Sequence, residues 1–259
     1  MDHEPHDHDG GLAHDLDRLL GRRRLLTLLA GAGLASLVGC GSGSDSNGST
    51  AGCSTIPEET AGPFPGDGTN GPDALTDSGA IRSDIRSSFG AANGVAEGVL
   101  LTVDLNVLGA TGSCTPIAGS AVYLWHCDRD GGYSMYSPGI TDQNYLRGVQ
   151  EADADGRVSF TTIVPGAYPG RWPHIHFEVY ASLADATSGG SPVAISQLAM
   201  SPEVCEATYA TAGYEASVRP FAETPLDSDG VFRDGSGQQV PAASGDARVG
   251  FTLELNVPV

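Results

Sequence analysis

Short runs of alternating apolar and polar side chains restrict the fold of this sequence more than any other feature. Alternate residues of a β-strand point to opposite faces, so such runs predict strands. No helical periodicity separates them, and strands without intervening helices predict an all-β fold, an antiparallel β-sandwich with few short helices. The predicted strands cover residues 99–108, 121–127, 157–163, 174–180 and 249–257, and one helix is predicted over 202–216.

The composition is that of one medium-sized domain. The chain has 259 residues, of which 40% are hydrophobic, so it can bury a core of its own. Its formal net charge is −19 and it contains no lysine. Because like charges repel over a Debye length, this charge argues against nucleic acid or an anionic bilayer surface as a partner.

The beginning of the chain predicts export. Arg22, Arg23 and Arg24 precede an apolar run, residues 25–38, that is too short for a membrane span. Paired arginines before an apolar run resemble a twin-arginine signal, which carries folded and often metal-loaded proteins. Residues 1–39 are therefore predicted to be an export signal that is removed.

A lipid anchor is predicted directly after this signal. Residues 37–40 read Leu-Val-Gly-Cys and resemble a bacterial lipobox, in which Cys40 becomes the acylated first residue. Residues 40–52 are rich in Gly, Ser, Asp and Asn and predict a flexible tether, followed by one domain over 53–259. The expected location is the cell envelope, held to a membrane through Cys40. Without lipidation the protein would be secreted.

Apart from the acylated Cys40, four cysteines and three histidines would remain after processing. An even number of cysteines in an oxidising compartment predicts two disulfides among Cys53, Cys114, Cys127 and Cys205. Cys114 with Cys127 and Cys53 with Cys205 is one of three possible pairings, and the sequence leaves the choice open. The four histidines before residue 15 would be lost, so histidine chemistry must come from His126, His174 and His176.

The segment around His174 carries the chemistry. Residues two apart in a strand share a face, so His174 and His176 project together as a pair of imidazoles. Tyr168 precedes them on a Pro/Gly-rich turn, and Tyr133 follows a predicted core strand. Two phenolates and two neutral imidazoles form a hard, anionic donor set that favours Fe(III) over zinc or Fe(II).

Several short motifs follow one another over about residues 57–180. They are Glu-Thr-Ala-Gly-Pro-Phe at 59–64, Ile-Arg-Ser-Asp-Ile-Arg at 81–86, the strand residues 122–128, Gly-Gly-Tyr-Ser at 131–134, Tyr-Leu-Arg-Gly at 145–148, Asp-Gly at 155–156, residues 165–171 and His-Ile-His at 174–176. In this order they resemble the intradiol ring-cleavage dioxygenase family. That family places Fe(III) between two tyrosines and two histidines on a β-sandwich, which implies Tyr133, Tyr168, His174 and His176 as metal ligands here. Arg171 matches the active-site arginine of the family.

The resemblance implies an enzyme that uses O2 to cleave a catechol-type ring between its two hydroxyls and gives muconate-type products. A catechol bound through both oxygens would displace one tyrosinate, Tyr133 or Tyr168, and the departing phenolate would accept a substrate proton. Arg171 would stabilise negative charge on the activated ring. The stretch from Tyr168 to His174 is shorter than in the well-known catechol and protocatechuate enzymes, and a helical N-terminal dimerisation domain is not recognisable. The sequence therefore leaves open which substituent the catechol carries and whether the protein forms a homo-oligomer.

Two other functions fit parts of the sequence. The first is a non-catalytic extracellular β-sandwich that serves as a binding module, although none of the four ligands is missing. The second is a zinc or copper protein whose ligands are His126, His174 and His176. Alternation places His126 on the face of Val122 and Leu124, which favours a hydrogen-bonded core histidine instead.

Overall fold

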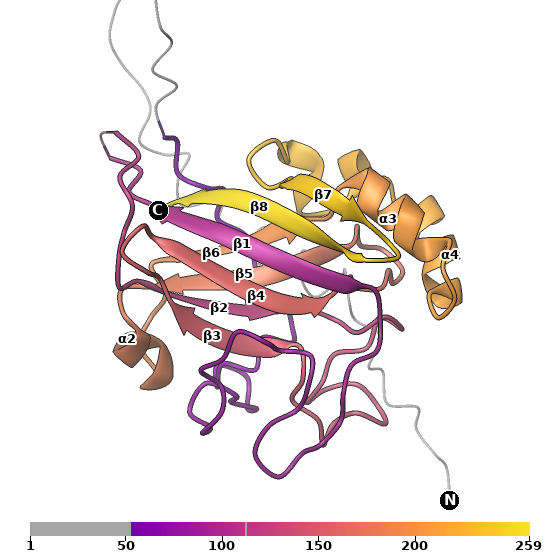
Figure 1. Ribbon diagram of the computed structural model, residues 1–259, viewed down its shortest axis with the longest axis horizontal. Helices are drawn as coiled ribbons and strands as arrows, with labels where there is room; N and C mark the ends of the chain where they lie inside the picture. The colour runs from indigo at the N-terminus through magenta and orange to yellow at the C-terminus, as the bar shows by residue number, and fades with distance from the viewer. Residues whose placement is uncertain (1–52, 112) are drawn as a thin grey trace, which may run out of the picture.

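The computed structural model describes residues 53–111 and 113–259, which form two four-stranded sheets packed face to face (Figure 1). The predicted sandwich is confirmed. The main hydrophobic cluster lies between the sheets and takes inward-facing residues from both, including Val103, Val122 and Phe177. In sheet order the strands are β4 (Arg157–Ile163), β1 (Leu100–Leu108), β8 (Gly250–Pro258) and β7 (Ala242–Asp246), then β3 (Arg147–Glu151), β2 (Ala121–Trp125), β5 (His174–Tyr180) and β6 (Ala194–Ala199).

One strand pair departs from the expected antiparallel arrangement. Every other neighbouring pair is antiparallel, but β1 and β8 run parallel, with Leu101 opposite Phe251. Two strands joined by a tight turn must be antiparallel, whereas β1 and β8 are joined only through most of the domain. The long connection leaves the direction of β8 free, and alternation along one strand carries no information about it.

The five predicted strands are all present, and the boundaries of β4 and β5 agree with those predicted. The prediction missed β3, β6 and β7. The residues of β7, Ala-Ala-Ser-Gly-Asp, are all exposed and therefore show no alternation. The single helix predicted over 202–216 is instead two helices, α3 (Pro202–Tyr209) and α4 (Glu215–Glu223). They are separated near Gly213, whose φ of +92° would strain any other residue.

Short helical elements lie at the two ends of the sandwich. Figure 1 shows α3 and α4 at one end and α2 (Leu183–Thr187) at the other. Two 3₁₀ turns, η1 (Leu226–Ser228) and η2 (Phe232–Asp234), follow α4. No helix in the described part of the chain is long and apolar enough to cross a membrane. The predicted export signal, Cys40 and the whole of the predicted tether lie outside the described residues.

Residues 56–96, here called the N-terminal segment, run along the edges of both sheets before β1 begins. They form backbone hydrogen bonds to β6, β3 and β4, which are three of the four edge strands. A second hydrophobic cluster lies between this segment and the outer face of the β3–β2–β5–β6 sheet. The edge contacts are Glu59 N to Ile195 O at 2.8 Å, Val149 N to Ala80 O at 2.9 Å, Thr161 N to Ser83 O at 2.8 Å and Ile85 N to Thr161 O at 2.9 Å.

The four cysteines that the structure describes form one disulfide, not two. Cys53 is bonded to Cys114, so the start of the domain is fixed to the β1–β2 connection. Cys127 and Cys205 are free and buried. Cys127 packs in the cluster on the outer face of its sheet, while Cys205 packs in the core between the sheets, so the two thiols serve different clusters as small apolar side chains.

Removing this disulfide is expected to destabilise the fold without touching the core. The bridge joins residues 61 positions apart, and closing a loop of that size stabilises by about 4 kcal/mol through the unfolded chain. Replacing both Cys53 and Cys114 with serine should lower the free energy of unfolding in a denaturant titration by that order. Reducing agent should produce the same loss in the wild-type protein and no further loss in the double variant. A reductant effect that persists in the variant would contradict the pairing.

Candidate active site

Four potential ligand atoms converge at one end of the β3–β2–β5–β6 sheet. The Oη atoms of Tyr133 and Tyr168 lie 3.2 Å apart, and Tyr168 Oη lies 3.1 Å from His174 Nε2. His174 Nε2 lies 3.2 Å from His176 Nε2. Ligands about 2 Å from a common ion, at angles of 90–110°, are roughly 3 Å apart. The structure therefore brings together all four predicted ligands at the spacing that a shared metal requires.

Strand β5 presents the two histidines on the outer face of its sheet. Ile175 and Phe177 alternate with them and enter the core between the sheets. His176 lies opposite Trp125 of β2, and the two rings stack with centroids 4.9 Å apart and planes 5° apart. Strand register and ring stacking together fix the direction of the His176 imidazole.

Two loops deliver the tyrosines. Tyr133 follows β2, and its ring packs 5.0 Å from that of Phe64 in the N-terminal segment. Tyr168 follows β4. The loops touch at Gly131, where a Cβ atom would lie 3.2 Å from Tyr168 Cβ and where φ is +84°. Glycine at this position allows the two tyrosine loops to approach closely enough for their hydroxyls to meet.

The imidazoles are held neutral. Burial lowers the pKa of both His174 and His176 well below the ordinary value, with further lowering by Arg171 at His174 and by His174 at His176. His174 Nδ1 lies 2.5 Å from the carbonyl oxygen of Trp172, which requires the proton on Nδ1 and leaves the Nε2 lone pair facing the other ligand atoms. A neutral imidazole with a free lone pair is the form that binds metal.

Tyr133 is difficult to ionise without a cation. Burial and the neighbouring phenol of Tyr168 raise the pKa of Tyr133 well above its ordinary value. A phenolate at this position therefore needs a strong positive charge within bonding distance. Among the residues that the structure describes, no group of three or more His, Cys, Asp or Glu side chains could hold a metal. A metal bound here would depend on both phenol oxygens as well as both imidazoles.

Arg171 lies beside these ligands and is 5% exposed. Its Nη1 is 3.4 Å from His174 Nε2, and its Nη2 donates to Gln197 Oε1 at 2.7 Å. Its Nε forms a buried ion pair with Asp229 at 2.9 Å. Sequence reasoning missed Gln197 and Asp229. Gln197 lies opposite His176 on β6, so predicting that strand would have found it, whereas no motif marks Asp229.

A second buried arginine, Arg147, ties the N-terminal segment to the Tyr133 loop. Its Nη1 donates to Pro65 O at 2.6 Å and its Nη2 to Phe64 O at 3.0 Å. The same guanidinium donates to the carbonyl and hydroxyl oxygens of Ser134 at 2.9 and 3.1 Å. Gly62 of this segment lies against His176, where a Cβ atom would be 3.2 Å from Cε1. The N-terminal segment is thus one wall of the site.

The alternative site with three histidines is not formed. His126 is 1% exposed, its Nδ1 lies 2.7 Å from Cys127 O, and its Nε2 lies 2.7 Å from Thr162 Oγ1. Both ring nitrogens therefore have partners elsewhere, and the predicted core histidine is confirmed. Burial lowers the pKa of His126 to about 4, so its ring is neutral near pH 7.

Glu178 is a buried carboxyl two residues beyond His176 on the same face of β5, and it makes the stability of the fold depend on pH. Tyr180 Oη donates to it at 2.7 Å, and burial raises its pKa to about 7. The unfolded carboxyl ionises near its ordinary pKa of 4.5, so the native state keeps this proton up to about pH 7. Stability therefore falls as the pH rises between these values.

Replacing Glu178 with glutamine should remove that fall. Between pH 5 and pH 8 the free energy of unfolding of the variant is expected to decrease by roughly 2 kcal/mol less than that of wild type. Denaturant titrations at the two pH values measure this. Glu254→Gln, which changes an exposed carboxyl on β8, is the matched control and should leave the wild-type dependence in place. Equal pH slopes in wild type and Glu178→Gln would contradict a buried, protonated Glu178.

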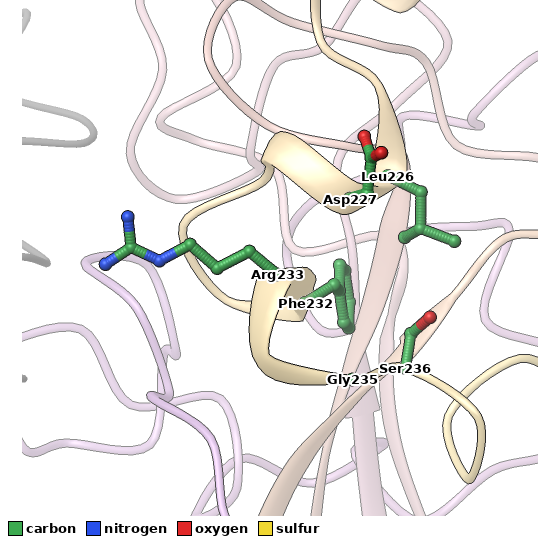
Figure 2. Close-up of a pocket in the computed structure, with 6 residues that line it drawn as sticks. All are labelled: Leu226, Asp227, Phe232, Arg233, Gly235 and Ser236. Carbon is green, nitrogen blue, oxygen red and sulfur yellow. The ribbon is translucent and has the colours of Figure 1, made fainter.

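A pocket of about 320 Å³ lies between η1 and η2. Figure 2 shows the side chains of Leu226, Phe232 and Ser236 around it, with Arg233 extending away. The Phe232 ring lies with its centroid 6.4 Å from that of His174. This one ring therefore contacts both the pocket and the surroundings of the ligand atoms.

Comparison with known proteins points to one group of enzymes. The family model described as "Dioxygenase" matches residues 71–176, which contain all four predicted ligands and Arg171. Chlorocatechol 1,2-dioxygenase of Rhodococcus opacus is 43% identical over 56 residues, 22% of each chain. The 6-chlorohydroxyquinol 1,2-dioxygenase of Cupriavidus pinatubonensis is 36% identical over 108 residues, 35% of this chain and 38% of that relative. The chain thus matches less than half the length of either relative.

Solved structures extend the similarity to most of the domain. An intradiol ring-cleavage dioxygenase from Tetranychus urticae is 26% identical, with a TM-score of 0.57, and the match covers 70% of this chain and 87% of that one. The dioxygenase domain of a dioxygenase carbohydrate-binding protein fusion from Streptomyces sp. SirexAA-E shares the fold, with a TM-score of 0.51 at 23% identity over 80% and 98% of the two chains.

Proposed function

Because the chain belongs to the intradiol ring-cleavage dioxygenase family, we propose that it is a non-haem Fe(III) enzyme that cleaves catechol-type rings between the two hydroxyls. Both atoms of O2 enter the product, a muconate-type dicarboxylic acid. The observation that carries the proposal is the convergence of two phenol oxygens and two imidazole nitrogens within 3.2 Å of their neighbours.

The ligand set suits Fe(III) by charge and by hardness. Two phenolates and one hydroxide balance three positive charges, which lowers the cost of holding the ion among buried side chains. Fe(III) held there would supply Lewis-acid activation of a catechol for its reaction with O2. Tyr133, Tyr168, His174 and His176 would hold it.

The side chains of the site supply proton transfer and charge stabilisation. The phenolate of Tyr133 would be a strong base at its Oη, since burial disfavours its ionised form, and either this phenolate or that of Tyr168 would take up a catechol proton. Arg171 directs Nη1 towards the ligand atoms, where it stabilises negative charge on the bound ring. The Trp125 stack and the Trp172 carbonyl keep the two imidazoles in place.

The proposal is tested by the visible spectrum and iron content of protein purified without residues 1–39. A broad tyrosinate-to-iron band that shifts when catechol is added anaerobically, followed by muconate formation when O2 is admitted, is expected. Protein that stays colourless after ferric reconstitution would overturn the proposal and favour a binding module instead.

The proposed substrates are catechols with a ring substituent, which would lie at the open side of the site. The relatives named above act on chlorocatechol and 6-chlorohydroxyquinol, and the short stretch from Tyr168 to His174 leaves out a wall that a longer loop would provide. Substituted and larger catechols are therefore the first compounds to compare, by the ratio of their kcat/KM values to that of catechol.

The proposed location is the cell envelope, with the domain anchored through acylated Cys40. The lipobox-like residues 37–40 support the anchor, and the Cys53–Cys114 disulfide supports an oxidising compartment. Replacing Cys40 with alanine is expected to move the protein from the membrane fraction to the soluble fraction of the envelope. Wild-type protein that is already soluble after fractionation would argue for secretion without a lipid.

A further inference from the structure

Asp229 is a fully buried carboxylate between η1 and η2. Its two oxygens accept hydrogen bonds from two separate parts of the chain. Its Oδ2 accepts from Arg171 Nε at 2.9 Å and from the backbone N–H of Trp172 at 2.7 Å. Its Oδ1 accepts from the backbone N–H groups of Val231 at 2.7 Å and Phe232 at 3.2 Å. One carboxylate thus joins the turn that carries Arg171 to the η1–η2 segment.

These contacts decide which edge of the Arg171 guanidinium faces the ligand atoms. Asp229 takes Nε, and Gln197 Oε1 takes Nη2 at 2.7 Å. Gln197 is itself fixed, because its Nε2 donates to Thr60 O at 2.8 Å. The remaining nitrogen, Nη1, lies 3.4 Å from His174 Nε2. With two of the three nitrogens engaged, the guanidinium plane has one orientation, and only Nη1 is directed at the ligand set.

We propose that Asp229 is a positioning residue for ring cleavage, which holds the guanidinium of Arg171 in place and balances its charge. The inference rests on the function proposed above and deepens it. A buried cation without its partner is costly and turns towards other acceptors, so loss of the Asp229 charge would misplace Nη1. Asp229 lies 53 residues beyond the end of the family match at His176, in a part of the chain that the family motifs do not reach.

Replacing Asp229 with asparagine removes the charge and keeps the size of the side chain. In iron-loaded protein, kcat is expected to fall roughly 10- to 100-fold, the range for a misplaced charge-stabilising group. Iron content, the tyrosinate-to-iron band and the Kd for catechol under anaerobic conditions should stay within about 3-fold of wild type, because Asp229 touches none of the four ligands. Unchanged kcat, or a fall in iron content that matches the fall in kcat, would overturn the inference.

Asp246→Asn is the matched control. Asp246 Oδ1 accepts from the backbone N–H groups two and three residues on, Arg248 at 2.7 Å and Val249 at 3.0 Å, which is the same local pattern as at Asp229. It lies exposed at the turn from β7 to β8, where its carboxylate accepts hydrogen bonds from backbone N–H groups and not from an arginine side chain. This variant should keep the wild-type kcat, so that a loss in both variants would be a general effect of disturbing such a turn.

A double variant separates positioning from folding. Arg171→Met combined with Asp229→Asn leaves no unpaired buried charge and is expected to fold even if Asp229→Asn alone does not. If Asp229 acts through Arg171, adding Asp229→Asn to Arg171→Met should lower kcat by less than about 3-fold. Multiplicative losses would overturn the inference. A wild-type protein without ring cleavage would overturn the proposed function as well, whereas an active wild type with a fully active Asp229→Asn overturns this inference alone.

Discussion

Replacing His176 with alanine is expected to abolish the tyrosinate-to-iron band and to lower turnover by at least roughly 10³-fold. The variant loses a residue that binds the metal directly, and even the loss of a residue that only hydrogen-bonds to a metal ligand typically lowers metal affinity or activity by about 10- to 100-fold. His176 supplies one of four converging atoms, and its stacked partner Trp125 has no atom that could substitute as a ligand. Iron content by metal analysis and ring cleavage by product absorbance measure the effect.

His126→Gln is the control for this result. His126 is as deeply buried as His176, but both of its ring nitrogens are bonded to core groups, so its replacement should spare iron and the visible band. Loss of metal from His126→Gln with retention in His176→Ala would reverse the assignment of ligands.

Replacing Arg171 with alanine should have the second-largest effect, a fall in kcat on the order of 10²- to 10³-fold with iron retained. Arg171 donates hydrogen bonds and contributes no ligand atom, so the ferric spectrum should persist. The variant also leaves Asp229 buried without its cation, which should lower thermal stability. Steady-state kinetics, iron analysis and a melting curve on one preparation separate these effects.

A second variant keeps that result interpretable. Arg171→Lys retains a charge but not the planar guanidinium that serves Asp229, Gln197 and the ligand edge at once, so it should recover stability more than turnover. Iron content that falls in step with kcat in both variants would show that Arg171 has a structural role only.

The sequence was most informative where local geometry decides the outcome. The two-residue spacing of His174 and His176 needs only a strand to bring both imidazoles to one face, and β5 has the predicted limits. Tyr168 lies only six residues before His174, so a single turn is enough to bring its hydroxyl close to the imidazole. Tyr133 required tertiary information, and the family resemblance supplied it.

Features that depend on distant segments could not be derived from the sequence. Asp229 meets Arg171 across 58 residues, and nothing in its surroundings distinguishes it from other aspartates in a chain with a net charge of −19. The disulfide expectation failed for a related reason. Parity counts cysteines but cannot tell that Cys127 and Cys205 face different hydrophobic clusters. The parallel pairing of β1 with β8 likewise depends on the path of the whole chain.

The N-terminal segment also decides where an independently folding unit can begin. All eight strands of the described chain lie after residue 99, so a shortened protein starting there would keep every one of them and would lose only Ile56 and Ile85 from the core between the sheets. It would nevertheless expose the unpaired backbone of β3, β4 and β6, which invites strand-to-strand association between molecules. It would also lose Gly62, Phe64 and Pro65 from the wall around His176 and Tyr133. A fragment that covers these strand edges and keeps this wall therefore has to start near Cys53, well before the first strand of the described chain.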